Sequence, residues 1–460
     1  MSDALSDSAA AATPAGLHAA LDRLPALIAD RSARIGVIGL GYVGVPLALA
    51  AAEAGFPVIG FDINAARVER LNAGASLIRH IPDARMQQAR AAGRFEATAD
   101  FARLAETDVI VICVPTPLTR QREPDLSFVA ATARAIRDTL RAGQLVVLES
   151  TTWPGTTREI VKPVLEETGL VSGRDFLLAY SPEREDPGNA SFATHAIARV
   201  VGGEGEQALA CAKAFYDAFV VKTVPVSSLE AAEAVKLTEN IFRAVNIALV
   251  NELKGVYGAM GIDIWEVIDA AATKPFGFMP FYPGPGLGGH CIPIDPFYLT
   301  WKAREFDIVT RFIELAGEIN TAMPHRVVDD LAAALDRRSG RGLNGARVLV
   351  LGVAYKKNVD DTRESPALKL IDLIEARGGT CDYHDPFIAA LPPTRAHPAL
   401  AGRESVALTP EALAQYAAAL VATDHDGVDY ALVARHVPVV VDTRNAFARA
   451  GIDADNVVKA

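Results

Sequence analysis

A glycine-rich segment that ends in a cysteine and an aspartate is the part of the chain best suited to covalent chemistry. Within residues 283–296, Cys291 follows the glycines Gly288 and Gly289 closely, and Asp295 comes four residues after it. Glycines let the backbone turn sharply and approach a ligand. A thiolate held in such a turn suits nucleophilic attack on a carbonyl carbon. Taken alone, such a segment is more typical of a tight turn with a buried structural cysteine, and the rest of the chain reverses that preference.

Two polar side chains on an expected helix suit the stabilisation of negative charge. Apolar residues recur at steps of three and four between about 229 and 260, which predicts a long helix. Lys236 and Asn240 are four residues apart and therefore share one face of it. Two donors side by side can stabilise an oxyanion. A solvated lysine and a polar asparagine on a helix surface remain the alternative for this pair alone.

A dinucleotide-binding unit is predicted near the start of the chain. An apolar strand at 33–38 leads into a GxGxxG turn, a helix and a second strand at 56–61, which ends at Asp62. The turn places backbone N–H groups near a pyrophosphate, and an acid about 20 residues further on binds a ribose 2′-hydroxyl. Asp62 would repel a 2′-phosphate, so the cofactor is predicted to be NAD. The expected contacts are Gly39, Gly41, Tyr42, Val43, Gly44 and Asp62. Arg67 either reaches the adenosine side or lies on a solvated helix face.

Strands and helices continue to alternate after this unit. Apolar strands at 108–114, 144–149 and 176–180 are followed by Thr116, Thr151 and Glu183. The carboxyl ends of parallel strands meet at the ligand side of a sheet, where these three side chains are expected. A second series of strands begins at 347–352, and Lys356, Lys357 and Arg363 follow it. These cations either hold phosphate or form a solvated basic loop.

The predicted fold class is α/β, with two Rossmann-like doubly wound domains joined by a long central helix in a helical middle domain. The expected divisions are a mobile or helical leader at 1–32, an NAD-binding domain at 33–222, a helical dimerisation domain at 223–325 and a C-terminal domain at 326–460. A chain of 460 residues is too long for one core, which agrees with several domains.

Composition excludes several classes of protein. The formal net charge of -11 and the absence of a Lys/Arg run argue against nucleic-acid binding. The four cysteines are far apart and show no metal-ligand spacing, so no metal is expected and the thiols fit a reducing cytoplasm. The sequence has no long uncharged apolar run, so no membrane span is expected.

With these motifs in order, the chain resembles the UDP-glucose/GDP-mannose dehydrogenase family over roughly residues 33–450. The matching segments are 39–44, 114–117, 181–183, 236–240, 288–291 with Asp295, 356–363 and 441–444. Segments 181–189 and 274–289 are most similar to the bacterial UDP-N-acetylglucosamine 6-dehydrogenases. Ile294 and Pro275 stand where UDP-glucose enzymes typically have Lys and Arg, and Lys274 is a candidate for the missing cation.

The resemblance implies a four-electron oxidation of a sugar C6 alcohol to a carboxylate, with two NAD and no metal. Lys236 and Asn240 would hold the C6 oxygen, Asp295 would act as base through water, and Cys291 would form a thiohemiacetal and a thioester. Glu183 would lie near the hydrolytic water. It further implies a homodimer or higher homo-oligomer and a role in surface polysaccharide synthesis.

The resemblance also implies binding roles. Thr116 and Thr151 would line the nicotinamide side, and Arg363 would reach the cofactor, often from a neighbouring subunit. The UDP portion of the substrate would be bound by Lys356, Arg444 and the segment containing Phe281, Tyr282, Gly284 and Gly288.

Other functions stay open at this point. UDP-ManNAc, UDP-GalNAc and UDP-glucose are alternative substrates to UDP-GlcNAc. A two-electron dehydrogenase of the hydroxyacid type would share the glycine turn but would not need Cys291. A non-enzymatic NAD sensor would bind NAD without turnover, and the joint presence of Cys291, Asp295, Lys236 and Asn240 argues against it.

Overall fold

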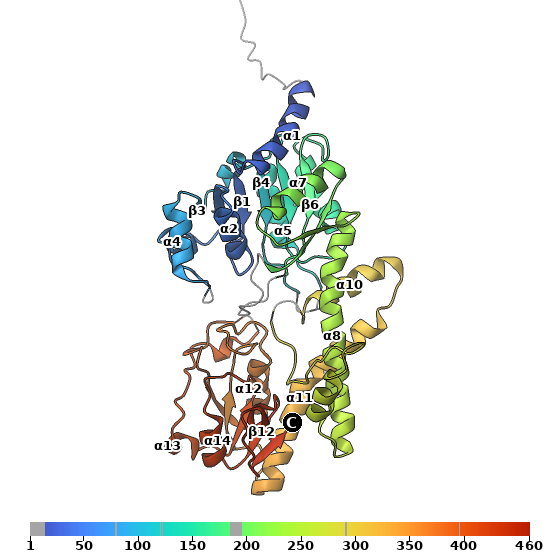
Figure 1. Cartoon of the computed structure of the whole chain (residues 1–460). Helices are drawn as coiled ribbons and strands as arrows, with labels where there is room; N and C mark the ends of the chain where they lie inside the picture. Colours follow the sequence, from blue (N-terminus) through green and yellow to red (C-terminus); the bar gives the residue numbers. More distant parts are fainter. Residues whose placement is uncertain are drawn as a thin grey trace, which may run out of the picture. The chain divides into compact units, whose positions relative to one another are not determined.

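The computed structural model describes residues 14–78, 81–119, 121, 123–184, 196–289, 292–394 and 396–460. The chain forms two compact units, residues 1–238 and 239–460 (Figure 1). The strands of the first unit are β1 Ile35–Ile38, β2 Val58–Phe61, β3 Phe95–Thr98, β4 Val109–Ile112, β5 Leu145–Leu148, β6 Leu177–Tyr180, β7 Arg199–Gly203 and β8 Thr223–Pro225. Its helices are α1 Pro14–Ala29, α2 Gly44–Glu53, α3 Ala65–Asn72, α4 Asp83–Ala91, η1 Phe101–Glu106, α5 Ser127–Arg137, η2 Thr157–Val161, α6 Lys162–Glu166 and α7 Glu206–Asp217.

The first sheet has the order β3-β2-β1-β4-β5-β6-β7-β8 among the described strands. Neighbouring strands are parallel except β6 and β7, where Ala179 pairs with Gly203. The chain turns back between β1 and β4, which makes the carboxyl ends of these strands the switch point where ligands bind in such sheets. β8 extends this sheet to Pro225, three residues beyond the boundary expected at 222.

The first sheet is buried on both faces, as a parallel sheet requires. Alternate residues of the central strands point to opposite sides: Ile35 and Val37 join one apolar cluster, whereas Ile38 joins the other. Helix α1 packs on α7 and buries Leu24 and Ile28 in the first cluster. Part of the segment expected as a leader is therefore a docked helix of the first unit.

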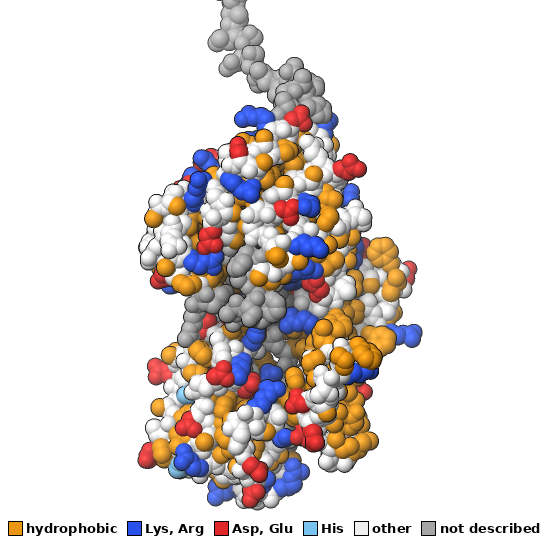
Figure 2. Space-filling model, viewed as in Figure 1, with side chains coloured by type: hydrophobic (Ala, Val, Ile, Leu, Met, Phe, Trp, Pro, Cys, Tyr) orange, Lys and Arg blue, Asp and Glu red, His pale blue; other side chains and the backbone are white. Residues whose placement is uncertain are grey.

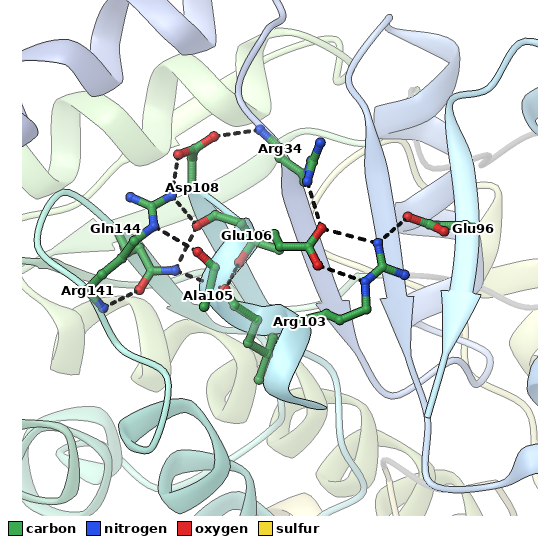
Figure 3. A network of polar contacts seen from close by, with 10 residues as sticks. Arg34, Glu96, Arg103, Ala105, Glu106, Asp108, Arg141 and Gln144 are labelled. Carbon is green, nitrogen blue, oxygen red and sulfur yellow. Dashed lines mark hydrogen bonds and ion pairs between the residues drawn. The ribbon is translucent and has the colours of Figure 1, made fainter. Parts of the chain in front are cut away.

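A network of ion pairs closes the amino ends of the first sheet (Figure 3). Arg34 bonds Glu106 at 2.8 Å, and Arg103 bonds both Glu96 and Glu106. Arg141 pairs with Asp108 at 2.6 Å. Arg34, Asp108 and Arg141 precede strands β1, β4 and β5, and Arg103 and Glu106 lie in η1, which leads into β4. The network is thus on the edge opposite to the ligand side, and we interpret it as structural.

The second unit begins within a long helix. Its helices are α8 Leu229–Ala259, which starts in the first unit, α9 Ile264–Ala272, α10 Asp295–Ala303, η4 Arg304–Phe306, α11 Arg311–Ser339, α12 Pro366–Ala376, η5 Pro398–Leu400, α13 Pro410–Leu413, α14 Tyr430–His436 and α15 Ala446–Arg449. The boundary expected between 325 and 326 lies inside α11, which continues through Pro324. None of the helices in the described part of the chain is both long and apolar enough to cross a membrane.

The second sheet is parallel and has the order β10-β9-β11-β12-β13 among the described strands. The strands are β9 Arg347–Leu351, β10 Thr380–His384, β11 Ala418–Val421, β12 Val440–Asp442 and β13 Val457–Lys459. Val348 and Val350 face one apolar cluster, whereas Leu349 and Leu351 face the other. Two Rossmann-like sheets are thus present, and the fold class expected from the sequence is confirmed.

Candidate active site

The glycine turn between β1 and α2 is held so closely that side chains are excluded at its two ends. A Cβ on Gly39, whose φ is +94°, would come 2.6 Å from the carbonyl oxygen of Cys113. A Cβ on Gly44 would run into the carbonyl oxygen of Gly39. Gly41, between them, faces open space. Close packing at both ends with open space in the middle fits a pyrophosphate laid across the turn at the start of α2.

Asp62 lies at the carboxyl end of β2 and is already engaged by the turn. Its Oδ2 accepts the Leu40 N–H at 3.0 Å and a bond from Arg67 at 3.0 Å, while its Oδ1 accepts the Asn64 N–H at 2.9 Å. A carboxylate oxygen has two lone pairs, so Oδ1 can also accept a ribose hydroxyl. Arg67 pairs with Asp62 in this structure, which gives it a contact that neither sequence interpretation included.

The predicted threonines lie where the strand ends place them. Thr116 is buried after β4, and Thr151 is half-buried after β5. Tyr42 packs against the apolar core beside the turn, next to Val43, which precedes α2. The turn, Asp62 and these strand ends lie together as expected for the NAD site of a Rossmann domain.

Lys236 and Glu183 form a buried ion pair in the first unit. Lys236 is 5% exposed and Glu183 is 8% exposed. The Lys236 Nζ donates to Glu183 Oε2 at 3.1 Å and also to the Glu183 carbonyl oxygen. Glu183 follows β6, so the pair joins helix α8 to the ligand edge of the first sheet.

Glu233, one turn before Lys236, was not singled out by the sequence. Its carboxylate accepts the Gly155 N–H, the Thr157 N–H and the Thr157 hydroxyl, the last at 2.6 Å. Burial raises its pKa to about 7, and these hydrogen bonds oppose the rise. Glu233 therefore anchors α8 to the loop after β5, the loop that contains Thr151. Nothing in the local sequence around Glu233 indicates these partners.

Asn240 and Asp295 form a second buried pair, within the second unit. They are 3% and 2% exposed. The Asn240 Nδ2 donates to Asp295 Oδ2 at 2.5 Å, and Asp295 is the first residue of α10. Lys236 and Asn240 are four residues apart on the unbroken helix α8 and share one face of it. Each donor is thus matched with its own carboxylate.

Cys291 lies outside the described residues, and the glycines before it lie within them. A Cβ on Gly288 would come 2.8 Å from the Tyr355 Cβ, and the Gly289 N–H donates to the Arg363 carbonyl at 3.1 Å. Gly288 and Gly289 are therefore packed closely on the loop that follows β9.

The segment that begins at Phe281 is held in place by residues of α8 and α9. Tyr282 stacks on Trp265 with ring centroids 5.4 Å apart, and its hydroxyl donates to Asp269 at 2.7 Å. The Gly284 N–H donates to Asn251 Oδ1 on α8 at 3.1 Å. The Tyr282 ring is thus used for packing, which leaves the backbone of this segment as the part that can border a substrate.

Arg444 follows β12 and lies against the Gly284 segment. Its Nε donates to the Ala422 carbonyl at 3.0 Å, and a Cβ on Gly284 would come 2.6 Å from the guanidinium. Burial lowers the pKa of Arg444. A half-buried arginine whose guanidinium lies beside a glycine backbone has the character of an anion-binding group.

The loop that contains Lys356 is held by a histidine that the sequence did not single out. The His425 Nδ1 accepts the Asn358 N–H at 2.9 Å, which places the ring proton on Nε2, 3.1 Å from Asp385 Oδ2. Asp385 also accepts the Val353 N–H, so one buried carboxylate orders the end of β9. Lys356 is half-buried in this loop. Arg363, in contrast, is partly exposed and binds Asp361 at 2.6 Å.

The other thiols are unsuited to chemistry. Burial raises the pKa of the Cys113 thiol. It raises the pKa of Cys211 to about 11 and the pKa of Cys381 to about 12. Within the described ranges, no group of three or more His, Cys, Asp or Glu could hold a metal ion.

Comparison with protein families matches three models in order along the chain. They are the NAD binding domain of the UDP-glucose/GDP-mannose dehydrogenase family at residues 33–220, its central domain at 230–322 and its UDP binding domain at 349–449.

Individual proteins agree with the models. The chain is 37% identical over 357 residues to UDP-N-acetyl-D-mannosamine dehydrogenase from Pyrococcus horikoshii, which covers 77% of this chain and 84% of the relative. It is 35% identical to UDP-N-acetyl-D-glucosamine 6-dehydrogenase from Pseudomonas aeruginosa, over 78% of this chain and 83% of the relative. The solved structure of the Pyrococcus horikoshii UDP-D-ManNAc dehydrogenase has a TM-score of 0.81 at 33% identity and covers 90% of this chain and 96% of its own. The chain therefore belongs to the UDP-glucose/GDP-mannose dehydrogenase family, as an NAD-dependent nucleotide-sugar dehydrogenase.

Proposed function

We propose that this protein oxidises the C6 alcohol of UDP-N-acetylglucosamine to the carboxylate, in four electrons, for surface polysaccharide precursor synthesis. The observation that supports this chemistry best is helix α8, which carries two buried donors on one face, Lys236 and Asn240. Their carboxylate partners, Glu183 and Asp295, are buried as well. Burying a polar group raises the free energy of the folded protein unless the group is paired. A donor paired with a carboxylate suits proton transfer, and two donors side by side suit an oxyanion.

Lys236 and Asn240 hold the C6 oxygen and stabilise its negative charge. Asp295 receives the hydroxyl proton through water, and its bond to the Asn240 amide keeps that amide oriented. The turn between Gly39 and Gly44 and the Asp62 carboxylate would hold NAD, which would supply the hydride acceptor for both oxidations. Glu183, fixed by Lys236, lies near the water that hydrolyses the final intermediate.

Cys291 retains the aldehyde between the two oxidations. Its thiolate adds to C6 to form a thiohemiacetal, the second oxidation gives a thioester, and water releases the carboxylate. Each alcohol consumes one water and two NAD and yields two NADH and three protons. The UDP part is held by Lys356, Arg444 and the backbone from Phe281 to Gly284.

The choice of sugar rests on the sequence segments 181–189 and 274–289. UDP-ManNAc, UDP-GalNAc and UDP-glucose are the alternatives, and the identities of 37% and 35% to the ManNAc and GlcNAc enzymes do not separate them. Lys274 is exposed and lies 5.0 Å from the Phe276 ring centroid. We propose Lys274 as the cation that replaces the one typical of UDP-glucose enzymes, because it begins the segment 274–289.

The proposed function predicts a fixed stoichiometry. With limiting UDP-GlcNAc and excess NAD, we expect about two NADH per sugar and slow turnover of UDP-glucose, measured by absorbance at the NADH band with each UDP-sugar in parallel. One NADH per sugar would contradict the four-electron route. Rapid turnover of UDP-ManNAc, UDP-GalNAc or UDP-glucose with none of UDP-GlcNAc would keep the chemistry and replace the sugar.

We also propose that the protein is a homodimer through an apolar patch of the second unit. Along α8, Phe242, Leu249 and Val256 are exposed at seven-residue steps. Phe312 and Leu315 expose 79% and 51% of their surface at the start of α11. Figure 2 shows apolar side chains gathered over the region of α8 and α10. Patches of this kind mark association surfaces, and a second copy of the same helix face would cover it.

The patch predicts the effect of a charge placed in it. The double variant Leu249→Glu with Phe312→Glu should shift the mass in solution from about two chains of 48.8 kDa to one, because two carboxylates would have to be buried on association. Light scattering after size exclusion measures this. Val221→Glu, at an exposed apolar residue of the first unit, is the control and should leave the mass unchanged. A double variant that stays dimeric would place the interface elsewhere.

A further inference from the structure

Lys254 has a buried ammonium that no group in the described structure binds. It lies on α8, and although the residue as a whole is half-buried, its Nζ is buried and has no hydrogen-bond partner among the described residues. An ammonium has three donors, and leaving them buried and unsatisfied is costly. Burial lowers the pKa of Lys254 to about 8. Because a buried ammonium without partners destabilises the folded protein, we expect Lys254 to have a binding partner that is absent from this structure.

The charges around Lys254 come from two other elements of the second unit. Asp330 on α11 and Asp442 on β12 favour its charged form, whereas Arg326 on α11 and Arg444 after β12 oppose it. Asp442 accepts the Arg444 N–H at 2.9 Å on one carboxylate oxygen and the Phe447 N–H at 3.0 Å on the other. Two carboxylates, Asp330 and Asp442, thus face three cations, Lys254, Arg326 and Arg444, and none of them bonds the Lys254 Nζ among the described residues. The excess of positive charge suits an anion.

The same face of α8 also holds the segment expected to border the substrate. Asn251 is one turn from Lys254, and its Oδ1 accepts the Gly284 N–H. Asn251 is itself fixed by Asn320, whose Nδ2 donates to the Ala244 carbonyl. Arg444 packs against Gly284. Lys254 thus lies one helical turn from the residue that holds Gly284, the glycine against which Arg444 packs.

An unused acceptor lies next to Arg444. Asn445 is 7% exposed, has a left-handed backbone with φ of 57°, and its Oδ1 is buried with no partner among the described residues. One unsatisfied donor group and one unsatisfied acceptor, both beside Arg444, match a ligand that offers acceptor oxygens as well as hydroxyl or N–H donors. A nucleoside diphosphate has both, whereas a simple anion offers mainly acceptors.

We propose that Lys254 is a nucleotide-binding residue, which donates to acceptor oxygens of the UDP part of the substrate beside Arg444, and that Asn445 accepts from the same nucleotide. This rests on the proposed function, because it takes UDP as the nucleotide. It adds a binding residue on α8 to those expected after β9 and β12. In the ligand-free protein Lys254 is destabilising, and the nucleotide satisfies it.

The test is Lys254→Met in the full-length chain, because methionine is an unbranched side chain only slightly shorter than lysine and carries no charge. We expect UDP affinity, measured by calorimetry, to fall at least about tenfold, while NAD affinity is unchanged. We expect the melting temperature without ligand to stay the same or rise by a few degrees, because a buried unpaired charge is removed. Lys369→Met, at an exposed position on α12, is the matched control and should keep wild-type UDP affinity.

Two results would overturn the proposal. Unchanged UDP affinity in Lys254→Met would show that Lys254 does not bind the nucleotide. A lowered melting temperature without ligand would assign Lys254 to a structural ion pair with Asp330 instead. Failure of the wild-type chain to bind UDP would be a different outcome, since it would contradict the proposed function itself.

Discussion

Replacing Lys236 by methionine should lower kcat for UDP-sugar oxidation by ~10²–10³-fold with little change in NAD affinity. Its ammonium is the donor expected to stabilise the C6 oxyanion, and removing one such donor costs about this much. The glycine turn and Asp62 are formed by β1, β2 and α2, so the cofactor site does not depend on this side chain. Turnover by stopped-flow absorbance and NAD binding by fluorescence measure the two effects.

The variant also has a structural effect that must be separated. Without Lys236, the Glu183 carboxylate is buried without its cation, and breaking such a pair costs about 3 kcal/mol or more. Lys236→Met combined with Glu183→Gln removes the isolated charge and should recover most of the melting temperature but none of the activity. If stability and activity recovered together, Lys236 would be a structural residue. A single variant that kept a tenth of wild-type kcat would exclude the oxyanion role.

The parts of the fold that follow from local pattern were predictable. The glycine turn, Asp62 at the end of β2 and the long helix α8 all lie where periodicity and turn residues placed them. These features depend on residues close in sequence, which is why the sequence is sufficient for them. The pairing of Asn240 with Asp295 was not predicted, although both residues were.

Features that depend on distant pairing were missed. β7 ends in Gly202 and Gly203, which are poor strand residues, and it begins with the charged Arg199. Arg199 is buried there because Glu149 bonds it at 2.5 Å, and no local pattern contains that partner. Helix α11 continues through Pro324, where a proline would ordinarily mark a boundary.

The same limit applies to the groups that support the site. Glu233, His425 and Lys254 are ordinary helix or loop residues in the sequence, and each is distinguished only by what surrounds it after folding. Glu233 accepts three hydrogen bonds from the loop after β5, and His425 bridges Asn358 and Asp385. The sequence therefore indicates candidates for the chemistry, whereas the residues that hold these candidates in place are identified only by the folded structure.

Replacing Cys291 by alanine should abolish formation of the uronic acid, with a loss of acid on the order of 10³-fold or more. Without the thiol there is no thiohemiacetal to retain the aldehyde and no thioester to hydrolyse. We expect at most one NADH per sugar in a single turnover with enzyme in excess, against two for the wild-type chain. The product is identified by mass spectrometry, since the acid and the aldehyde differ in mass.

The remaining cysteines supply the control. Cys113, Cys211 and Cys381 have thiols whose pKa is raised by burial, so at neutral pH they stay protonated and react slowly with iodoacetamide. Alkylation of the wild-type chain should therefore modify Cys291 first and stop acid formation at about one label per chain, whereas Cys113→Ala should keep two NADH per sugar. UDP-sugar should slow the labelling by covering the thiol. If Cys291→Ala still produced two NADH, the aldehyde would have to be oxidised as its hydrate, and the covalent route would be wrong even though the same acid is made.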